Sequence, residues 1–363
     1  QMKTNLKYSI VIILLGIIVR LVLIFMPGFQ IDVNDWFAWA IRLSNLNLAQ
    51  FYSKDIFTDY TPGYLYVLSL LGFFKKILFI PDNIFYLLLK MPALICDLII
   101  GLFIYKEVKK NISPRVALLA LILILFNPAV IFNSSIWGQI DSILTLFMLI
   151  TIIALKNNKL ILSSIMFGIA LLIKPQAIAL APLMFFFLIN HFKLSNILKL
   201  TTPGLLIIFI LAFPFFPNNT VFNLVQHILN TAGEYPYTSL NAYNLLGVVG
   251  FWVPDNMLWN SLSYQNIGII LFSFYWIILG YFYFQRKLSI YALAVLATLG
   301  FFFLPTKVHE RYLYSALIFL IFLGSLYRDK LLLTLTGVLS FLHFLNLYYV
   351  YVYYNEIYFK LPK

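Results

Sequence analysis

The chain has 363 residues, 62% hydrophobic and 10% charged, with a mean hydropathy of +0.92. A soluble domain is about 45–50% apolar and about 25% charged, so this composition excludes an ordinary soluble protein and indicates a polytopic membrane protein. The formal net charge is +12. Because the Lys and Arg residues lie in short stretches between apolar runs, we attribute this charge to membrane orientation and anionic lipids rather than to nucleic-acid binding.

Apolar segments follow one another along almost the whole chain, and each is predicted to form a helix. Several are shorter than the roughly 20 residues that a helix needs to cross a bilayer, so we expect tilted or broken spans. The predicted segments are 8–27, 63–79, 84–105, 115–133, 140–155, 160–173, 176–190, 198–216, 264–284, 289–304, 312–327 and 331–353. The predicted fold class is an all-α integral membrane protein in which 1–363 form one transmembrane domain, with no separate soluble domain.

Basic connectors recur after every second span from Lys106 onward and are therefore predicted to be cytoplasmic. Two longer stretches, 28–62 and 217–263, then face outward as the first and second external loops. Residues 61–105 must cross an odd number of times, once with a re-entrant segment or three times with a break at Pro92. The total is about 11 or 13 spans, with the N-terminus inside and the C-terminus outside.

The first external loop opens with the sequence IDVNDWFAWA, at 31–40, directly after the first span. Its apolar and aromatic residues predict a helix that lies along the membrane interface. Asp32 and Asp35 are three residues apart and would share one face of that helix. The alternative is structural, because Asp32 is also well placed to cap the start of the helix.

Further carboxylates occur at the ends of later segments. Asp59 and Tyr60 precede the dipeptide Pro62-Gly63, which predicts a tight turn that returns the loop to the membrane surface. Asp141 follows Gln139 in the sequence WGQID. An ionisable residue at the mouth of a span is a candidate functional residue.

Several cationic residues break the positive-inside pattern because they lie at outer span ends. For Lys174 and Lys307, the alternative is a side chain that extends to lipid headgroups. The consecutive residues His309, Glu310 and Arg311 are harder to explain in this way, since they cost several kcal/mol at a helix start unless they line a polar cavity. Because Arg grips phosphate with two parallel hydrogen bonds, an outward cationic pocket for the phosphate of a lipid carrier is predicted.

Taken together, these motifs resemble the GT-C membrane glycosyltransferases. The resemblance is closest to the bacterial and archaeal group related to the second mannosyltransferase of GPI-anchor synthesis, and the pattern is also similar to the glucosyltransferases that extend lipid-linked oligosaccharides. Thr61 and Gly63 depart from it, since related sequences often carry proline and leucine there. The motifs are Asp32 to Trp39, DYTP at Asp59 to Pro62, WGQID at Trp137 to Asp141, KPQA at Lys174 to Ala177, and HERYLY at His309 to Tyr314.

The resemblance implies a GT-C-type helical bundle with short amphipathic helices in the first external loop, and an inverting transferase that uses a polyprenyl-phosphate sugar. It implies that Asp32 is the general base, with Asp35 beside it as a second catalytic carboxylate. His309, Arg311 and Lys174 would bind the donor phosphate. Because the lipid phosphate leaves as an anion and cations stabilise it, a divalent metal is neither required nor excluded. The further substrate-binding candidates are Asp59, Tyr60, Trp137, Gln139, Asp141, Gln176 and Glu310.

The expected partners are a polyprenyl-phosphate hexose, with mannose as the first choice, a lipid-linked or cell-envelope glycan acceptor, and membrane lipids, but no nucleic acid. The expected location is the plasma membrane of a prokaryote, with the acidic loop and the basic cluster facing one outward chamber. A transporter or flippase of lipid-linked sugars is the main alternative, and a structural subunit of an envelope-assembly complex is another. If the chain were such a structural subunit, the substitution Asp32→Asn would leave its function unchanged.

Overall fold

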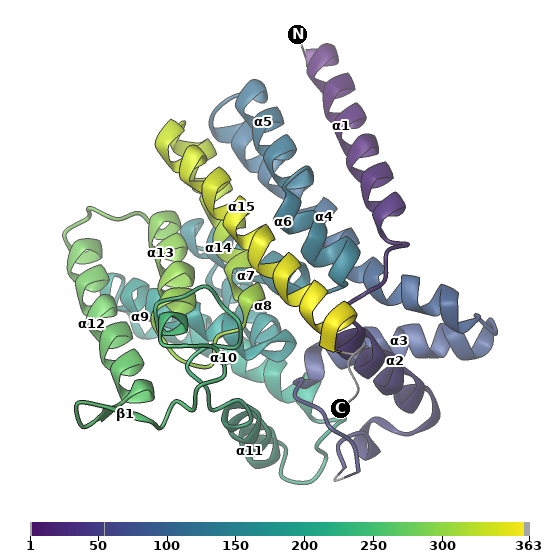
Figure 1. The fold of residues 1–363 in the computed structure, drawn as a ribbon. Coiled ribbons are helices and arrows are strands. Elements are labelled where there is room, and N and C mark those ends of the chain that lie inside the picture. The colour runs from purple at the N-terminus through teal and green to yellow at the C-terminus, as the bar shows by residue number, and fades with distance from the viewer. Residues whose placement is uncertain (1, 54, 359–363) are drawn as a thin grey trace. The chain divides into compact units, whose positions relative to one another are not determined.

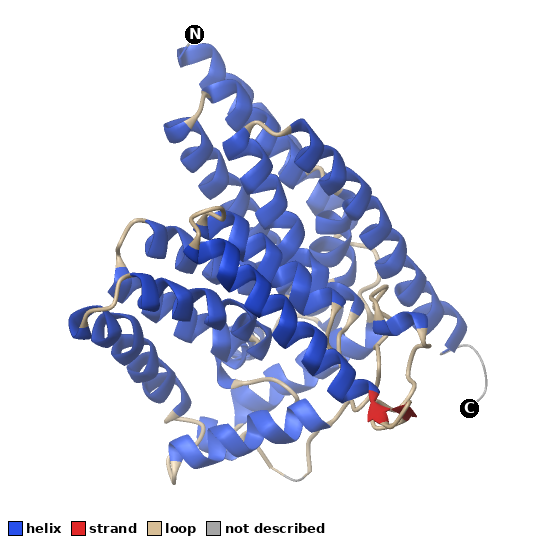
Figure 2. Ribbon diagram, turned by 90° about the vertical axis from the view of Figure 1, so that its left-hand side faces the viewer, coloured by secondary structure: helices blue, strands red, loops and turns tan. Residues whose placement is uncertain are grey.

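The computed structural model describes the backbone of residues 2–53 and 55–358 and the side chains of residues 7–53 and 55–356. Helices make up most of this described part (Figures 1 and 2), which confirms the predicted all-α membrane class. The described ranges contain one small antiparallel hairpin, in which β1 (Leu258–Trp259) pairs with β2 (Leu262–Ser263).

The chain divides into two compact units. The first comprises Gln1–Phe37, Ile80–Leu146 and Leu313–Lys363, and the second comprises Ala38–Phe79 and Phe147–Tyr312. Helices α2 (Gln30–Asn45) and α7 (Asp141–Lys156) begin in the first unit and end in the second. The first unit also contains α1 (Met2–Leu23), α4 (Asp82–Asn111), α5 (Pro114–Leu125), α6 (Pro128–Ile131), a π-helical segment (Phe132–Trp137), α14 (Tyr314–Tyr327), α15 (Lys330–Val352) and a second π-helical segment (Tyr353–Tyr358). The second also contains α3 (Pro62–Ile77), α8 (Leu160–Ile173), α9 (Ala181–Asn190), α10 (Leu194–Ala212), α11 (Thr220–Gly233), α12 (Tyr264–Phe284), α13 (Ile290–Phe303), and short 3-10 turns at Leu48–Gln50, Pro175–Leu180 and Leu246–Val248. A further 3-10 turn, Glu310–Leu313, begins in the second unit and ends at the first residue of the last segment of the first unit.

The predicted segments agree with the observed helices, apart from where the breaks fall. Pro92 lies inside α4, which is one helix of 30 residues, so the alternative in which Pro92 divides two spans is wrong. The apolar stretch 115–133 is broken instead, with a 47° bend between Pro114–Leu125 and Pro128–Trp137. Asn127 starts the second piece, because its side-chain oxygen accepts the backbone N–H groups of Ala129 and Val130.

Four helices in the described part are long and apolar enough to cross a membrane, or up to five if the bent pair forms one span. They are Asp82–Asn111, Leu194–Ala212, Tyr264–Phe284 and Lys330–Glu356. Shorter apolar helices occur at Leu160–Ile173, Pro175–Asn190 and Ile290–Phe303. The predicted count of about 11–13 spans requires several shorter helices to cross as well, and it stays a prediction.

A buried ion pair fastens the helices of the first unit. Arg20 of α1 donates through Nε and Nη2 to Asp97 Oδ2 of α4 at 3.2 Å, and both side chains are fully buried. Ser134 donates to the same oxygen at 2.5 Å, and the Tyr314 hydroxyl donates to Asp97 Oδ1. Buried charges persist only when paired and hydrogen-bonded, so this cluster fixes α1, α4, α14 and the π-helical segment Phe132–Trp137 against one another.

In the second unit, α8 packs against α10 and α3 through small residues. Gly204 of α10 donates its N–H to Ser164 Oγ of α8 at 2.8 Å, where the two backbones approach closely. At the C-terminal end of α8, Thr61 Oγ1 donates to the Leu172 carbonyl at 2.7 Å. Gly63 lies against the same carbonyl, and a Cβ there would collide with it. The start of α3 is therefore held beside the end of α8.

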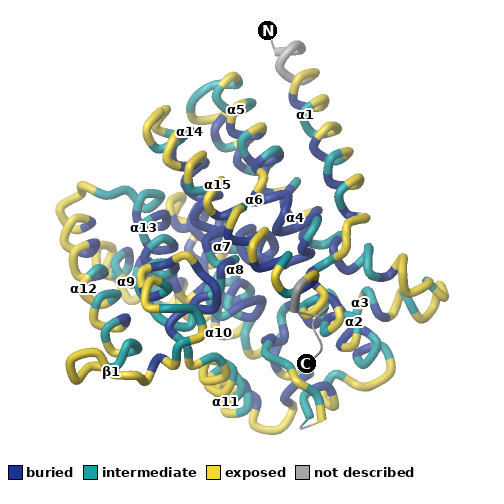
Figure 3. Tube along the Cα trace, in the orientation of Figure 1, coloured by how far each residue is buried: buried dark blue, intermediate teal, exposed yellow. Residues whose placement is uncertain are grey.

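Several helices carry many exposed residues (Figure 3), and large apolar side chains are among them. On α10, the candidate span Leu194–Ala212, Leu205, Leu206 and Ile210 are each more than half exposed. On α12, Phe274 and Ile277 are exposed to a similar extent. Such faces are stable against lipid tails rather than water, as the predicted membrane class requires.

Candidate functional site

In the first unit, the carboxylate of Asp32 is held by two uncharged donors. Trp137 Nε1 donates to Asp32 Oδ2 at 2.8 Å, and Gln139 Nε2 donates to the same oxygen at 2.6 Å. No described residue donates to Oδ1. The first backbone N–H of α2, that of Gln30, is bonded to the Asn355 side chain at 3.0 Å. Asp32 is thus partly exposed and fixed by its neighbours, and its hydrogen bonds with Trp137 and Gln139 are not those of a helix cap.

A sharp turn brings Trp137 and Gln139 to Asp32. The backbone N–H groups of Gly138 and Gln139 both donate to the carbonyl of Asn133, at 3.1 and 2.9 Å. Gly138 has a φ of +92°, a left-handed conformation that favours glycine. The indole of Trp137 also stacks on Phe29, with ring centroids 4.3 Å apart. The broken helix, the turn at Gly138 and the stacking on Phe29 together orient the two donors, Trp137 and Gln139.

Asp141, the last residue of the WGQID motif, is buried against Asn133. Its side chain is 2% exposed, and Asn133 Nδ2 donates to its Oδ2 at 3.1 Å. Asn133 therefore holds the turn through its backbone oxygen and Asp141 through its side chain. The motif thus provides two donors to Asp32 and one buried anchor.

The two tryptophans of the stretch 28–62 are packing residues. Trp36 and Trp39 are 1% and 2% exposed, so neither offers a ring face on which a sugar could stack. Trp39 Nε1 donates to the Phe57 carbonyl at 3.0 Å. Asp35 is partly exposed on α2, one helical turn after Asp32.

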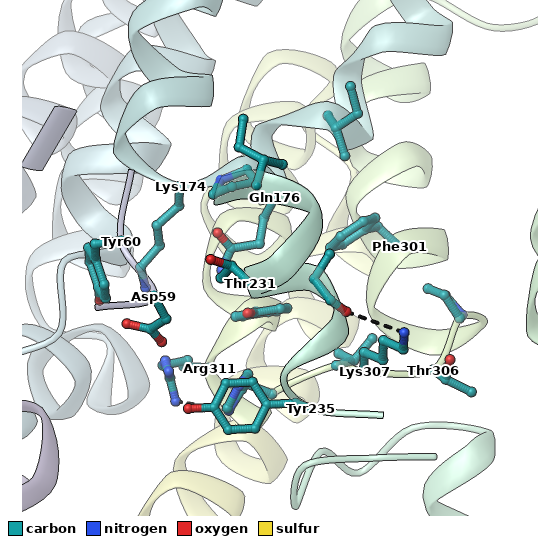
Figure 4. A pocket seen from close by; sticks show the side chains of 18 of the residues that line it. Asp59, Tyr60, Lys174, Gln176, Thr231, Tyr235, Phe301, Thr306, Lys307 and Arg311 are labelled. Carbon is teal, nitrogen blue, oxygen red and sulfur yellow. Dashed lines mark hydrogen bonds between the residues drawn. The ribbon is translucent and has the colours of Figure 1, made fainter. Parts of the chain in front are cut away.

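In the second unit, a cavity of about 260 Å³ gathers the predicted basic cluster. Its wall combines three cationic side chains, one carboxylate and several aromatic rings (Figure 4). We call it the cationic pocket. Its lining includes Asp59, Tyr60, Lys174, Gln176, Thr231, Tyr235, Phe301, Thr306, Lys307, His309, Arg311 and Tyr312, together with Ile173, Pro175, Ile178, Ile228, Ala232, Pro305 and Val308.

Lys174 enters the pocket because α8 ends there. It is the first residue after the helix, in an extended conformation imposed by the following Pro175. Its side chain is 5% exposed, and its ammonium lies 5.9 Å from the centre of the Tyr60 ring. In Figure 4 the Lys174 side chain points toward Asp59. The packing of α3 on α8 therefore brings the DYTP motif to the KPQA motif.

His309 and Arg311 form the other side of the pocket. Arg311 Nη1 lies 3.2 Å from His309 Nδ1, and because a guanidinium only donates, Nδ1 must accept and the ring proton lies on Nε2. Burial holds the pKa of His309 well below its ordinary value, and the positive charges of Arg311 and, to a smaller extent, Lys174 lower it further. His309 is therefore neutral near pH 7 and offers an N–H donor rather than a third cation.

Glu310 supports Arg311 instead of lining the pocket. It is 2% exposed, and its Oε1 accepts Arg311 Nη1 at 2.9 Å. Its Oε2 lies 4.0 Å from His309 Nδ1. A carboxylate behind a guanidinium fixes the orientation of its planar donors. Glu310 therefore contacts Arg311 and does not line the cationic pocket, and its substrate-binding role stays a prediction.

The segment before His309 is tied to the stretch 217–263, which was predicted to be the second external loop. Lys307 N–H donates to the Tyr237 carbonyl at 2.9 Å, and Leu240 N–H donates to the Val308 carbonyl at the same distance. Lys307 Nζ donates to the Ala232 carbonyl at 3.2 Å and lies 3.9 Å from Asp255 Oδ2. These contacts hold the backbone that carries the basic cluster.

The sequence analysis did not select several pocket residues. Tyr235, Thr231 and Phe301 lie far from the motifs in sequence, and nothing in their local pattern separates them from packing residues. Tyr312 lies within HERYLY and Lys307 lies two residues before it, so the motif and its flank contained a signal for both. In the described part of the chain, no three His, Cys, Asp or Glu side chains lie close enough to hold a metal ion. The metal requirement stays a prediction.

The structure thus groups the candidate residues in two places. Asp59, Tyr60, Lys174, Gln176, His309 and Arg311 line one pocket, while Trp137 and Gln139 contact Asp32. The expectation that both groups face one chamber stays a prediction.

A protein-family model described as dolichyl-phosphate-mannose-protein mannosyltransferase matches residues 60–218, which is less than half of the chain. The matched range includes WGQID and KPQA and stops before HERYLY. No curated protein matches the chain. The family match supports a membrane glycosyltransferase of the GT-C type.

Proposed function

We propose that the chain transfers a hexose, with mannose as the first choice, from a polyprenyl phosphate to a lipid-linked or cell-envelope glycan, with inversion at the anomeric carbon. We also propose that the reaction takes place at the outer face of a prokaryotic membrane. The chain would then belong to the group related to the second mannosyltransferase of GPI-anchor synthesis. The observation that supports this proposal is the hydrogen bonding of Asp32. Trp137 and Gln139 both donate to Asp32 Oδ2, while no described residue donates to Oδ1. One oxygen is thereby oriented and the other is left to accept a proton.

In this mechanism Asp32 Oδ1 removes the proton from an acceptor hydroxyl as that oxygen attacks the anomeric carbon. The bond from this carbon to the phosphate oxygen breaks, and the electron pair stays on the polyprenyl phosphate. Lys174 and Arg311 stabilise the negative charge that develops there, and His309 donates one hydrogen bond through Nε2. The leaving phosphate needs no proton at neutral pH, so no general acid is required.

Residues of the cationic pocket have matching roles in the proposal. Asp59 accepts hydrogen bonds from sugar hydroxyls, and Gln176 both accepts and donates them. Tyr60 and Tyr235 pack against the sugar ring. Asp35, on the same helix as Asp32, is the second carboxylate near the acceptor. The proposal needs no divalent metal, because Lys174 and Arg311 supply the positive charge at the phosphate. Transfer is therefore expected to continue in the presence of a chelator.

A transfer assay tests the function. The purified protein in lipid vesicles is supplied with a set of radiolabelled polyprenyl-phosphate hexoses and a glycolipid acceptor, and wild type is compared with Asp32→Asn and Arg311→Ala. We expect transfer from one donor, with loss in both variants. Undiminished transfer by Asp32→Asn would remove the base assignment, and binding of donors without turnover of any would favour the transporter.

A further inference from the structure

Helix α11 has three distinct faces. Leu224, His227, Ile228 and Thr231 form the face turned toward the protein: Leu224 is 6% exposed, and Ile228 and Thr231 line the cationic pocket. His227 Nε2 lies 3.0 Å from the Tyr60 carbonyl, which fastens this face to the DYTP segment. The inner side of α11 is therefore one wall of the pocket.

A second face of α11 is apolar and exposed. Val221, Val225 and Leu229 follow one another at intervals of four residues, and Phe222 lies beside them. Their exposed fractions are 64%, 49%, 66% and 66%, respectively. We call these four residues the apolar stripe. In Figure 3 exposed residues alternate with more buried ones along α11.

The third face is polar and uncharged. Asn223, Gln226 and Asn230 lie along it, with Gln226 and Asn230 exposed. The helix contains no Asp, Glu, Lys or Arg. A helix that has protein on one side, apolar residues on the second and polar residues on the third matches three surroundings at once: protein, lipid and water.

The chain before α11 indicates which of the possible partners covers the apolar stripe. Helix α10, a candidate membrane span with few buried residues, ends at Ala212, and Phe213 directly after it is 48% exposed. Helix α11 begins at Thr220, so its apolar stripe follows closely on the lipid-facing surface of α10. At its other end, Lys307 Nζ donates to the Ala232 carbonyl, which places a cation at the helix C-terminus.

We propose that α11 lies in the membrane–water interface with the apolar stripe in the lipid, and that it forms the lipid-side wall of the cationic pocket. The partner of this surface is the bilayer, rather than a second copy of the chain or a soluble protein. If the pocket binds a lipid phosphate, as the proposed function requires, the acyl or prenyl chain leaves the pocket alongside α11. The position of α11 itself does not depend on the proposed function.

Spin-label accessibility tests the position. Cys96 is the only cysteine of the sequence, so single labels at Phe222→Cys, Leu229→Cys, Gln226→Cys and Asn230→Cys can be introduced in a Cys96→Ala background. The protein is placed in phosphatidylglycerol–phosphatidylethanolamine vesicles, and collision rates are measured with oxygen, which concentrates in lipid, and with a water-soluble nickel chelate. We expect the oxygen-to-nickel ratio to be several-fold higher at Phe222 and Leu229 than at Gln226 and Asn230.

Two results would overturn the proposal. Equal ratios on the two faces would mean that the apolar stripe faces water. Protection of Phe222 and Leu229 from both reagents would mean that protein covers them, and spin–spin broadening that depends on protein density would identify a second copy.

A binding measurement then tests the link to the pocket. Phe222→Ser combined with Leu229→Ser is compared with the matched control Gln226→Ser combined with Asn230→Ser, using radiolabelled polyprenyl phosphate in the same vesicles. We expect about tenfold weaker binding in the apolar-stripe variant and unchanged binding in the control. Equal binding in both would reject the wall role. If wild type itself binds no polyprenyl phosphate while the label pattern holds, the proposed function fails and the position of α11 stands.

Discussion

The two groups of candidate residues fix their charged side chains in opposite ways. Asp32 is a single carboxylate held by neutral donors, Trp137 and Gln139, whose bonds leave its net charge intact. In the cationic pocket, by contrast, Glu310 sits behind Arg311 and Asp255 near Lys307, so carboxylates orient the cations and offset part of their charge. The first arrangement suits a group that must change protonation during a reaction, and the second suits a group that must keep its charge and position.

The largest expected effect separates these two roles directly. Asp32→Asn should lower the turnover rate by about 10²- to 10⁴-fold, the usual contribution of a general base, while donor affinity stays within about twofold. Arg311→Lys should act mainly on donor binding and weaken donor affinity by about tenfold, because the planar, fixed donors of arginine are lost. Since the positive charge is kept, turnover should fall less than in Asp32→Asn. Single-turnover kinetics and equilibrium binding of the donor measure the two quantities. A loss of donor affinity in Asp32→Asn would contradict the division.

The second prediction disturbs the packing that forms the cationic pocket without substituting a charged residue. Gly63→Ala places a Cβ against the Leu172 carbonyl and should force α3 away from the end of α8, at a cost of about 1–3 kcal/mol. Thermal unfolding in detergent and donor affinity should both fall. Gly337→Ala is the matched control, because no atom lies within 4 Å of a Cβ at that position. Equal melting temperatures for both variants would show that the α3–α8 contact is not tight.

The third prediction sharpens the description of Asp32. Gln139→Leu removes one of the two donors and should lower turnover by about tenfold, because a hydrogen bond to a charged group contributes about 1.5 kcal/mol. Gln139→Glu, which replaces the donor with a repelling charge, should lower it further. Wild-type turnover in Gln139→Leu would mean that Trp137 alone holds the carboxylate.

The smallest expected effect is a pH dependence of donor binding. His309 is neutral in the free pocket because its pKa is lowered, and a bound phosphate raises that pKa, so binding takes up a proton. Donor affinity should therefore increase as the pH falls from about 7 toward the lowered pKa, and His309→Gln should remove this slope. Titrations of donor binding at several pH values, with wild type and His309→Gln in parallel, measure it. An affinity that falls with decreasing pH would reverse the assignment.

Most helices were predictable because each apolar segment carries its own signal. The stretches 160–173 and 264–284 were predicted to the residue, since a membrane helix satisfies its backbone hydrogen bonds within one segment. The break near Pro128 was not predicted, and Pro92 was considered as a break although α4 continues through it. Both positions contain proline, and what differs is Asn127, whose side chain caps a new helix.

The sequence by itself determined that the chain is a helical membrane protein and which motifs carry its polar residues, because hydropathy and residue type act locally. Only the tertiary structure decided what those residues touch. It turned Asp141 inward to Asn133, placed Glu310 behind Arg311, and joined Asp59 and Tyr60 to Lys174 through the contact of Gly63 with Leu172. Asp59 and Tyr60 are separated from Lys174 along the chain by whole helices. Packing of backbone against backbone, which has no local signature, brings them together.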